Sequence, residues 1–82
     1  MNERRTYEVV RNKVAELCEL PVEKVHGNSN FFDLGFHSLL AVQFVAEIER
    51  ELNIRLSLVD VFVYPSVTGI VESIEKKQAS EK

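Results

Sequence analysis

The stretch FFDLGFHSLL at residues 31–40 decides the fold of this chain. Its first part reads as a loop rich in large apolar side chains, and its second part begins a helix from about Ser38 to Leu52. Gly35 supplies a backbone conformation that other residues resist, just before the helix. The apolar loop residues predict packing beneath this junction, which presents the hydroxyl of Ser38 at the helix N-terminus.

The rest of the chain predicts three more helices. Apolar residues at three- and four-residue spacing indicate a first helix over residues 6–18. A long connection follows at residues 19–37, and its irregular apolar residues suggest a loop pinned across the core. A short helix is expected over residues 58–62, and a last one from residue 67 to about 77. The fold class is therefore all-α, a small four-helix bundle of three main helices and one short helix, with a long ordered loop between helices one and two.

Capping residues support these boundaries. Asn53 tolerates the left-handed conformation that ends a helix, so it is predicted to end helix two. Ser57, followed three residues later by Asp60, is the N-terminal signature of the short helix. Ser66 is predicted to cap the last helix.

Composition restricts the classes of protein. Eighty-two residues form a single domain, 1–82, with a folded core at 6–77 and a frayed tail at 78–82. A net charge of −3 disfavours binding to nucleic acid or to an anionic membrane surface. The single cysteine, Cys18, excludes an internal disulfide and is predicted to be a small buried filler. Without a signal-peptide or membrane-span pattern, we expect a cytoplasmic monomer.

Helix two has two apolar faces. One is a wide stripe assigned to the core, made of Leu40, Ala41, Phe44, Val45, Ile48 and Leu52. On the opposite side Leu39, Val42 and Ala46 form a second strip, and Ser38 lies at its head. A helix packed on one side needs no second strip, so this strip is predicted to dock a partner. The alternative is that these are ordinary scattered surface residues.

Ser38 is the strongest candidate for chemistry. His26 and His37 are isolated from the single cysteine, so the sequence offers no metal-ligand cluster. His37 beside Ser38 lacks an acidic third member for a nucleophilic triad. The plain alternative is that Ser38 is an N-cap serine. A phosphoryl group bonded to Ser38 would be stabilised by the free N–H groups and the dipole of the helix, so the hydroxyl is predicted to be an attachment point.

Two runs resemble the acyl and peptidyl carrier proteins, the phosphopantetheine-binding family. The first is DLGFHSL, residues 33–39, and the second is VFVYPSV, residues 61–67. The likeness extends from about Tyr7 to Ile74 and includes the helix order and the long first loop.

The resemblance implies that Ser38 carries a 4′-phosphopantetheine arm, added from coenzyme A by a phosphopantetheinyl transferase. The thiol of the arm would hold an acyl or aminoacyl group as a thioester. The protein, itself no enzyme, would receive that group from a loading enzyme and deliver it to downstream synthase enzymes. The resemblance implies docking by Phe36, His37, Leu39, Val42, Ala46 and Val61. The acidic tilt from Glu47, Glu49 and Glu51 is expected to steer basic partner patches.

The sequence leaves the pathway open among peptide, polyketide and fatty-acid carriers. His37 resembles the residue before the serine in peptidyl carriers of nonribosomal peptide assembly, whereas Phe36 and the segment at residues 64–66 resemble polyketide carriers. Two other classes compete with the carrier hypothesis. One is an unmodified helical protein-interaction module, and the other is a helix-turn-helix DNA binder, which the acidic balance disfavours.

Overall fold

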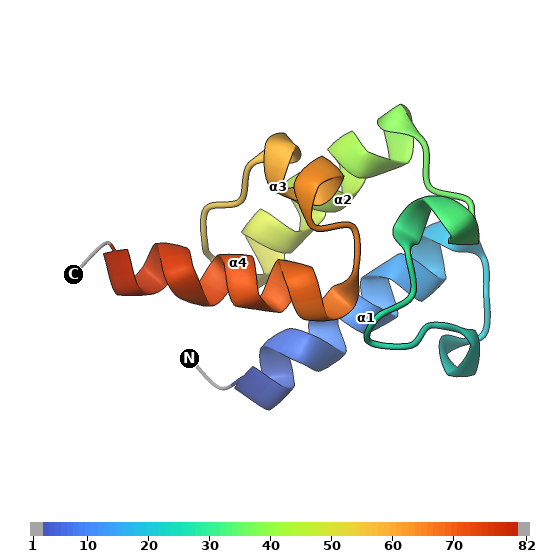
Figure 1. The fold of residues 1–82 in the computed structure, drawn as a ribbon, viewed down its shortest axis with the longest axis horizontal. Coiled ribbons are helices and arrows are strands. Elements are labelled where there is room, and N and C mark those ends of the chain that lie inside the picture. The colour runs from blue at the N-terminus through green and yellow to red at the C-terminus, as the bar shows by residue number, and fades with distance from the viewer. Residues whose placement is uncertain (1–2, 81–82) are drawn as a thin grey trace.

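The computed structural model describes residues 3–80, and the side chains of residues 4–78. The helical segments, in chain order, are α1 (Glu3–Cys18), η1 (Val22–Lys24), η2 (Phe31–Leu34), α2 (Ser38–Leu52), α3 (Leu58–Val63) and α4 (Val67–Ser80). Across residues 3–80 there is no strand. The predicted all-α bundle of three long helices and one short helix is confirmed (Figure 1). The long loop contains two 3₁₀ helices, η1 and η2, which the sequence pattern did not predict.

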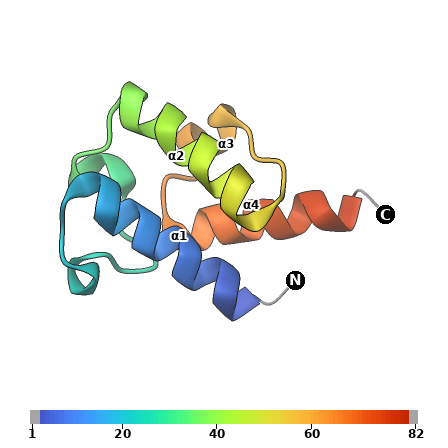
Figure 2. The same ribbon diagram turned by 180° about the vertical axis from the view of Figure 1, so that it is seen from behind.

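The bundle is built around α1, which packs against both α2 and α4. The short helix α3 lies between α2 and α4 and contacts both, as Figures 1 and 2 show from opposite sides. The fully buried side chains come from all four α-helices and from the long loop, and the largest are Phe31, Phe44, Ile48, Ile70 and Ile74. No helix within residues 3–80 has both the length and the apolar content needed to cross a membrane.

Three helix boundaries differ from the prediction. α1 begins at Glu3 rather than at residue 6, because a polar first turn propagates a helix without adding to its apolar stripe. α3 is one residue longer than predicted and ends at Val63. α4 continues to Ser80, so residues 78–80 of the predicted frayed tail are helical, since glutamine and alanine favour the helix. Residues 81–82 of that tail lie outside the described residues.

The long loop is fixed at both the core and α4. Val25 and Phe31 are fully buried, which confirms that apolar side chains pin the loop across the core. The N–H of Phe31 donates to the carbonyl of Pro65 at 2.7 Å, and the N–H of Thr68 donates to the carbonyl of Gly27 at 2.9 Å. The first bond joins the loop to the turn between α3 and α4, and the second joins it to the first turn of α4. The segment before Ser38 is therefore held in place by residues 65–68.

Cys18 lies at the edge of the core. It was predicted to be a small buried filler, and it is half-buried and packs against the core cluster. Burial raises the pKa of its thiol. A thiol with a raised pKa is a weak nucleophile at neutral pH, which fits a packing role.

Candidate functional site

Ser38 is exposed and is the first residue of α2. The N-cap is His37, whose backbone is extended (φ −144°, ψ 178°) and whose side chain makes no capping hydrogen bond. The carbonyl of His37 accepts from the N–H of Ala41 at 2.9 Å. The alternative that Ser38 itself caps the helix is therefore wrong, and its hydroxyl is not used to cap α2.

The N-terminus of α2 differs from those of α3 and α4. Ser57 and Asp60 form a complete capping box on α3, and Ser66 Oγ accepts from the N–H of Gly69 at 3.0 Å at the start of α4. At α2 the side chain of the N-cap residue, His37, makes no capping hydrogen bond, and the first turn contains no acidic residue. The first-turn N–H groups of a helix have no partner within the helix, and together with the dipole they favour a bound anion. The start of α2 therefore suits a negatively charged group on Ser38.

A left-handed glycine and a buried phenylalanine position Ser38. Gly35 follows the last residue of η2 and has φ 112° and ψ 3°. Its N–H donates to the carbonyl of Phe31, the first residue of η2. The same carbonyl accepts from the N–H of Phe36 at 3.1 Å. The Phe36 side chain is 5% exposed, and its ring centroid lies 5.0 Å from Phe31 and 5.5 Å from Phe44. Because the chain is anchored at Phe36, the backbone two residues later is fixed against the body of α2.

Phe36 was predicted to dock a partner, and its burial contradicts that prediction. Its ring packs between Phe31 of η2 and Phe44 of α2, so almost none of it is open to a partner. The sequence pattern could not separate an anchor from an exposed residue here, because an irregular loop has no apolar periodicity.

Further aromatic contacts connect the loop to α3. The half-buried ring of Phe32 stacks on Phe62 with 5.4 Å between ring centroids and 13° between planes. It also meets Phe36 edge-on at 6.3 Å. Asn30 supports this segment by accepting from the N–H of Phe32 at 2.8 Å. The residues before Ser38 are thus packed against both α2 and α3.

The second strip of α2 faces outward. Leu39 is 71% exposed, Val42 is 51% exposed, and Ala46 is also exposed, as is His37 before the helix. The predicted exposure of the strip is confirmed, while its docking role stays a prediction. The inward side is formed by Ala41, Phe44, Ile48 and Leu52. Two residues assigned to the core, Leu40 and Val45, are only half-buried because they lie at the edges of that face.

The predicted docking residue Val61 is fully buried, so that prediction is contradicted. On α3 the exposed side chains are Leu58, Val59, Phe62 and Val63. The sequence LVDVFV has one polar residue, Asp60, so its pattern does not indicate which residue of this helix points inward. The exposed apolar face of α3 was therefore missed.

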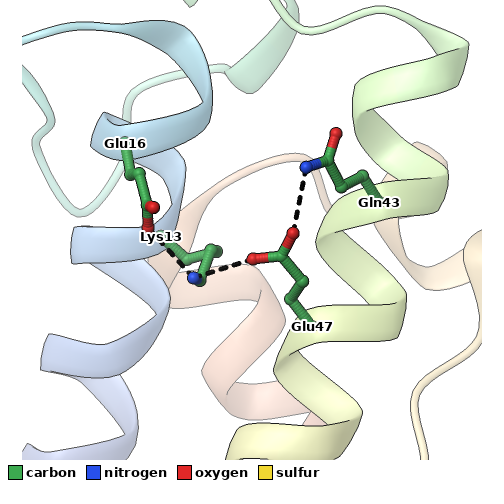
Figure 3. A network of polar contacts seen from close by, with 4 residues as sticks. All are labelled: Lys13, Glu16, Gln43 and Glu47. Atoms are coloured by element: carbon green, nitrogen blue, oxygen red, sulfur yellow. Dashed lines mark hydrogen bonds and ion pairs between the residues drawn. The ribbon is translucent and has the colours of Figure 1, made fainter.

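Two of the three acidic residues expected to steer partners are used inside the molecule. Glu47 accepts from Lys13 of α1 at 2.8 Å and from Gln43 at 3.0 Å, as Figure 3 shows. The hydrogen bond from Lys13 is the main cause that lowers the pKa of Glu47. Glu49 accepts from the N–H of Leu56 at 2.8 Å. These contacts fasten α2 to α1 and to the chain after α2, so the expected steering role is not supported for Glu47 or Glu49.

Comparison with protein families and known proteins identifies what the chain resembles. A family model described as "Phosphopantetheine attachment site" matches residues 8–74. A linear gramicidin synthase of Brevibacillus parabrevis is 43% identical over 77 residues, which cover 92% of this chain and 2% of that protein. Dimodular nonribosomal peptide synthase of Bacillus subtilis (strain 168) is 42% identical over 64 residues, covering 72% of this chain and 3% of that protein. The chain thus spans a few per cent of the length of these relatives.

A solved structure shares the fold. The NMR structure of the HMG-ACPI domain from the CurA module of Lyngbya majuscula superposes with a TM-score of 0.84, covering 98% of this chain and 81% of that one. The two sequences are 21% identical, so this likeness supports the helical architecture.

Proposed function

The chain belongs to the family of phosphopantetheine attachment domains, and from that premise we propose that Ser38 is the residue that carries the 4′-phosphopantetheine group. The observation that supports this choice most directly is that Ser38 is an exposed serine at the start of a helix whose N-cap residue makes no side-chain cap. An attached phosphodiester would place its negative charge beside the first-turn N–H groups of α2.

The other serines with described side chains are poorer candidates. Ser57 Oγ accepts from the N–H of Val59, Ser66 Oγ from Gly69, and Ser29 Oγ from the N–H of His26. Ser73 is 7% exposed on α4. Each of these hydroxyls is occupied by a local hydrogen bond or belongs to a buried residue, whereas Ser38 is an exposed residue.

Attachment would transfer the phosphopantetheine part of coenzyme A to Ser38 in one displacement, catalysed by a phosphopantetheinyl transferase. The Ser38 oxygen loses its proton and forms a bond to the phosphorus that bears the pantetheine. The bond between that phosphorus and the bridging diphosphate oxygen breaks, and the adenosine bisphosphate leaves. The thiol that ends the bound group then holds an acyl or aminoacyl cargo as a thioester.

The proposed role is a carrier in nonribosomal peptide-type biosynthesis. The two synthase relatives named above and the His37–Ser38 pair favour this class over a polyketide pathway. The chain would catalyse no step itself. It would accept its cargo from a loading enzyme and present it to downstream synthase enzymes, since a tether gives the cargo a high local concentration. The exposed strip Leu39, Val42 and Ala46, with His37 before it, is the proposed docking surface.

Intact-mass measurement tests the proposal. The purified chain is incubated with coenzyme A and a promiscuous phosphopantetheinyl transferase, and we expect a single phosphopantetheine adduct. Ser38→Ala should remove the adduct while circular dichroism shows an unchanged helical fold. Ser29→Ala, which removes another serine hydroxyl from the same part of the chain, should still be modified. Failure of the folded wild-type chain to take up the group would favour the unmodified interaction module instead.

A further inference from the structure

The short helix α3 has little buried surface of its own. Of its six residues, Val61 alone is fully buried, and four apolar side chains are exposed by 38% to 64%. Helices this short are not stable in water without tertiary contacts. The conformation of α3 therefore depends on a small number of specific interactions with its neighbours.

One of these interactions comes from the last turns of α4. Lys77 Nζ lies 3.2 Å from Asp60 Oδ2, and the Asp60 side chain is 16% exposed. The same carboxylate oxygen accepts from the N–H of Ser57 at 3.2 Å, which completes the capping box of α3. A single carboxylate thus both caps α3 and pairs it with α4. Loss of the lysine would leave a half-buried carboxylate without this cation.

The other end of α3 rests on the first turn of α4. A Cβ added to Gly69 would lie 2.8 Å from Tyr64 Cβ and 3.1 Å from the Tyr64 carbonyl, so the two segments are in close contact. The N–H of Tyr64 donates to the carbonyl of Asp60 at 2.8 Å. α4 therefore contacts both ends of α3. Gly69 packs closely against Tyr64 at the C-terminal end of α3, and Lys77 pairs with Asp60 near its N-terminal end.

From these contacts we infer that the Asp60–Lys77 ion pair controls a local opening of α3, in which α3 separates from α4 and unwinds while α1, α2 and α4 stay folded. Opening removes Phe62 from its stack on Phe32, so the loop segment that precedes Ser38 loses one packing partner. Lys77 is thus a positioning residue that acts on the surroundings of Ser38 from the opposite end of the chain. This inference needs no modification of Ser38 and is independent of the proposed carrier role.

Amide hydrogen exchange measured by NMR on the full unmodified chain tests the inference. Lys77→Met removes the cation, and because the pair is partly exposed we expect exchange of the amides from Val61 to Tyr64 to become about two- to fivefold faster. The amides of α1 and α2 should keep their wild-type rates. Lys77→Arg retains the charge and should exchange at close to the wild-type rate.

Two controls separate this mechanism from a general loss of charge or stability. Lys13→Met also removes a paired lysine, but from α1, and should leave the α3 amides unchanged. Asp60→Asn keeps a carbonyl oxygen for Ser57 and removes the pair, so adding Lys77→Met to this variant should produce no further acceleration. Further acceleration by Lys77→Met on top of Asp60→Asn, an equal effect of Lys13→Met on α3, or uniform acceleration over all helices would each overturn the inference.

Discussion

The ring of Phe36 lies 5.5 Å from the ring of Phe44, with 74° between their planes. Phe36 is two residues before Ser38, and Phe44 is on the inner face of the helix that Ser38 begins. The loop therefore packs against the helix it leads into, and the backbone between them has little freedom. This contact explains how an exposed serine can have a fixed position, since burial beside it replaces hydrogen bonds to the serine itself.

Phe36→Ala tests this anchoring. Truncating a buried phenylalanine should lower the free energy of unfolding by about 3–5 kcal/mol. That is a large share of the roughly 5–15 kcal/mol typical of folded domains. Urea denaturation followed by circular dichroism gives the measurement. Phe62→Ala removes a ring that is 48% exposed and should reduce stability by less. A smaller loss for Phe36→Ala than for Phe62→Ala would contradict the anchoring role.

Gly35→Ala measures the free-energy cost of the left-handed backbone conformation just before Ser38. Gly35 has φ 112°, and a Cβ placed on it would meet nothing within 4 Å. Destabilisation should therefore arise from the left-handed backbone alone, at about 1–2 kcal/mol. Denaturant midpoints of the two proteins provide the comparison. If Gly35→Ala were as stable as the wild type, the left-handed turn before Ser38 would have to be abandoned.

The two faces of α2 should respond differently to substitution. Val42→Asp and Ala46→Asp change exposed positions and should alter stability by no more than about 0.5 kcal/mol. Ile48→Ala leaves a cavity at a fully buried position and should lower the free energy of unfolding by about 2–5 kcal/mol. If the strip is the docking surface, the aspartate variants should also slow transfer from a cognate loading enzyme. Unchanged transfer rates, with folding intact, would remove the strip from the docking surface.

The sequence predicts most of the fold because each long helix has a clear apolar stripe. In α2 the stripe through Phe44 and Ile48 is periodic, so its four buried residues were identified correctly, and only Leu40 and Val45 at its edges are half-buried. The capping box of Ser57 and Asp60 was likewise predicted, because capping depends on residues close in sequence.

Features set by distant contacts could not be predicted. Phe36 was itself a predicted docking residue and Phe62 is next to another, Val61, yet Phe36 is buried and Phe62 is exposed. Phe36 is buried because it packs against the rings of Phe31 and Phe44. Phe62 is exposed because it lies on the outer face of α3, a short helix with a single polar residue. The prediction that Ser38 lies at the start of α2 was correct, but only the backbone geometry shows that the N-cap is His37.

The ion pair between Lys13 and Glu47 should make stability depend on pH. Hydrogen bonding to Lys13, and then to Gln43, lowers the pKa of Glu47, and hydrogen bonding to Glu47 raises the pKa of Lys13. A carboxyl with a lowered folded-state pKa contributes stability above its unfolded pKa, about 4.3, and that stability is lost as pH falls through the folded value. A lysine with a raised pKa contributes below its unfolded value, about 10.4, and loses that contribution at higher pH.

Glu47→Gln should therefore be less stable than the wild type between about pH 5 and pH 10, and the difference should shrink as the pH falls below about 4.3 toward the lowered folded-state pKa of Glu47. Urea midpoints of both proteins at pH 7 and pH 3 provide the measurement. Glu51→Gln removes the same charge from an exposed position on α2, so it should show a smaller difference at pH 7. Because salt screens exposed charges, 1 M NaCl at pH 7 should also reduce the effect of Glu47→Gln. A difference that persisted unchanged at pH 3 would mean that packing or hydrogen bonding by Glu47, rather than its charge, joins α1 to α2.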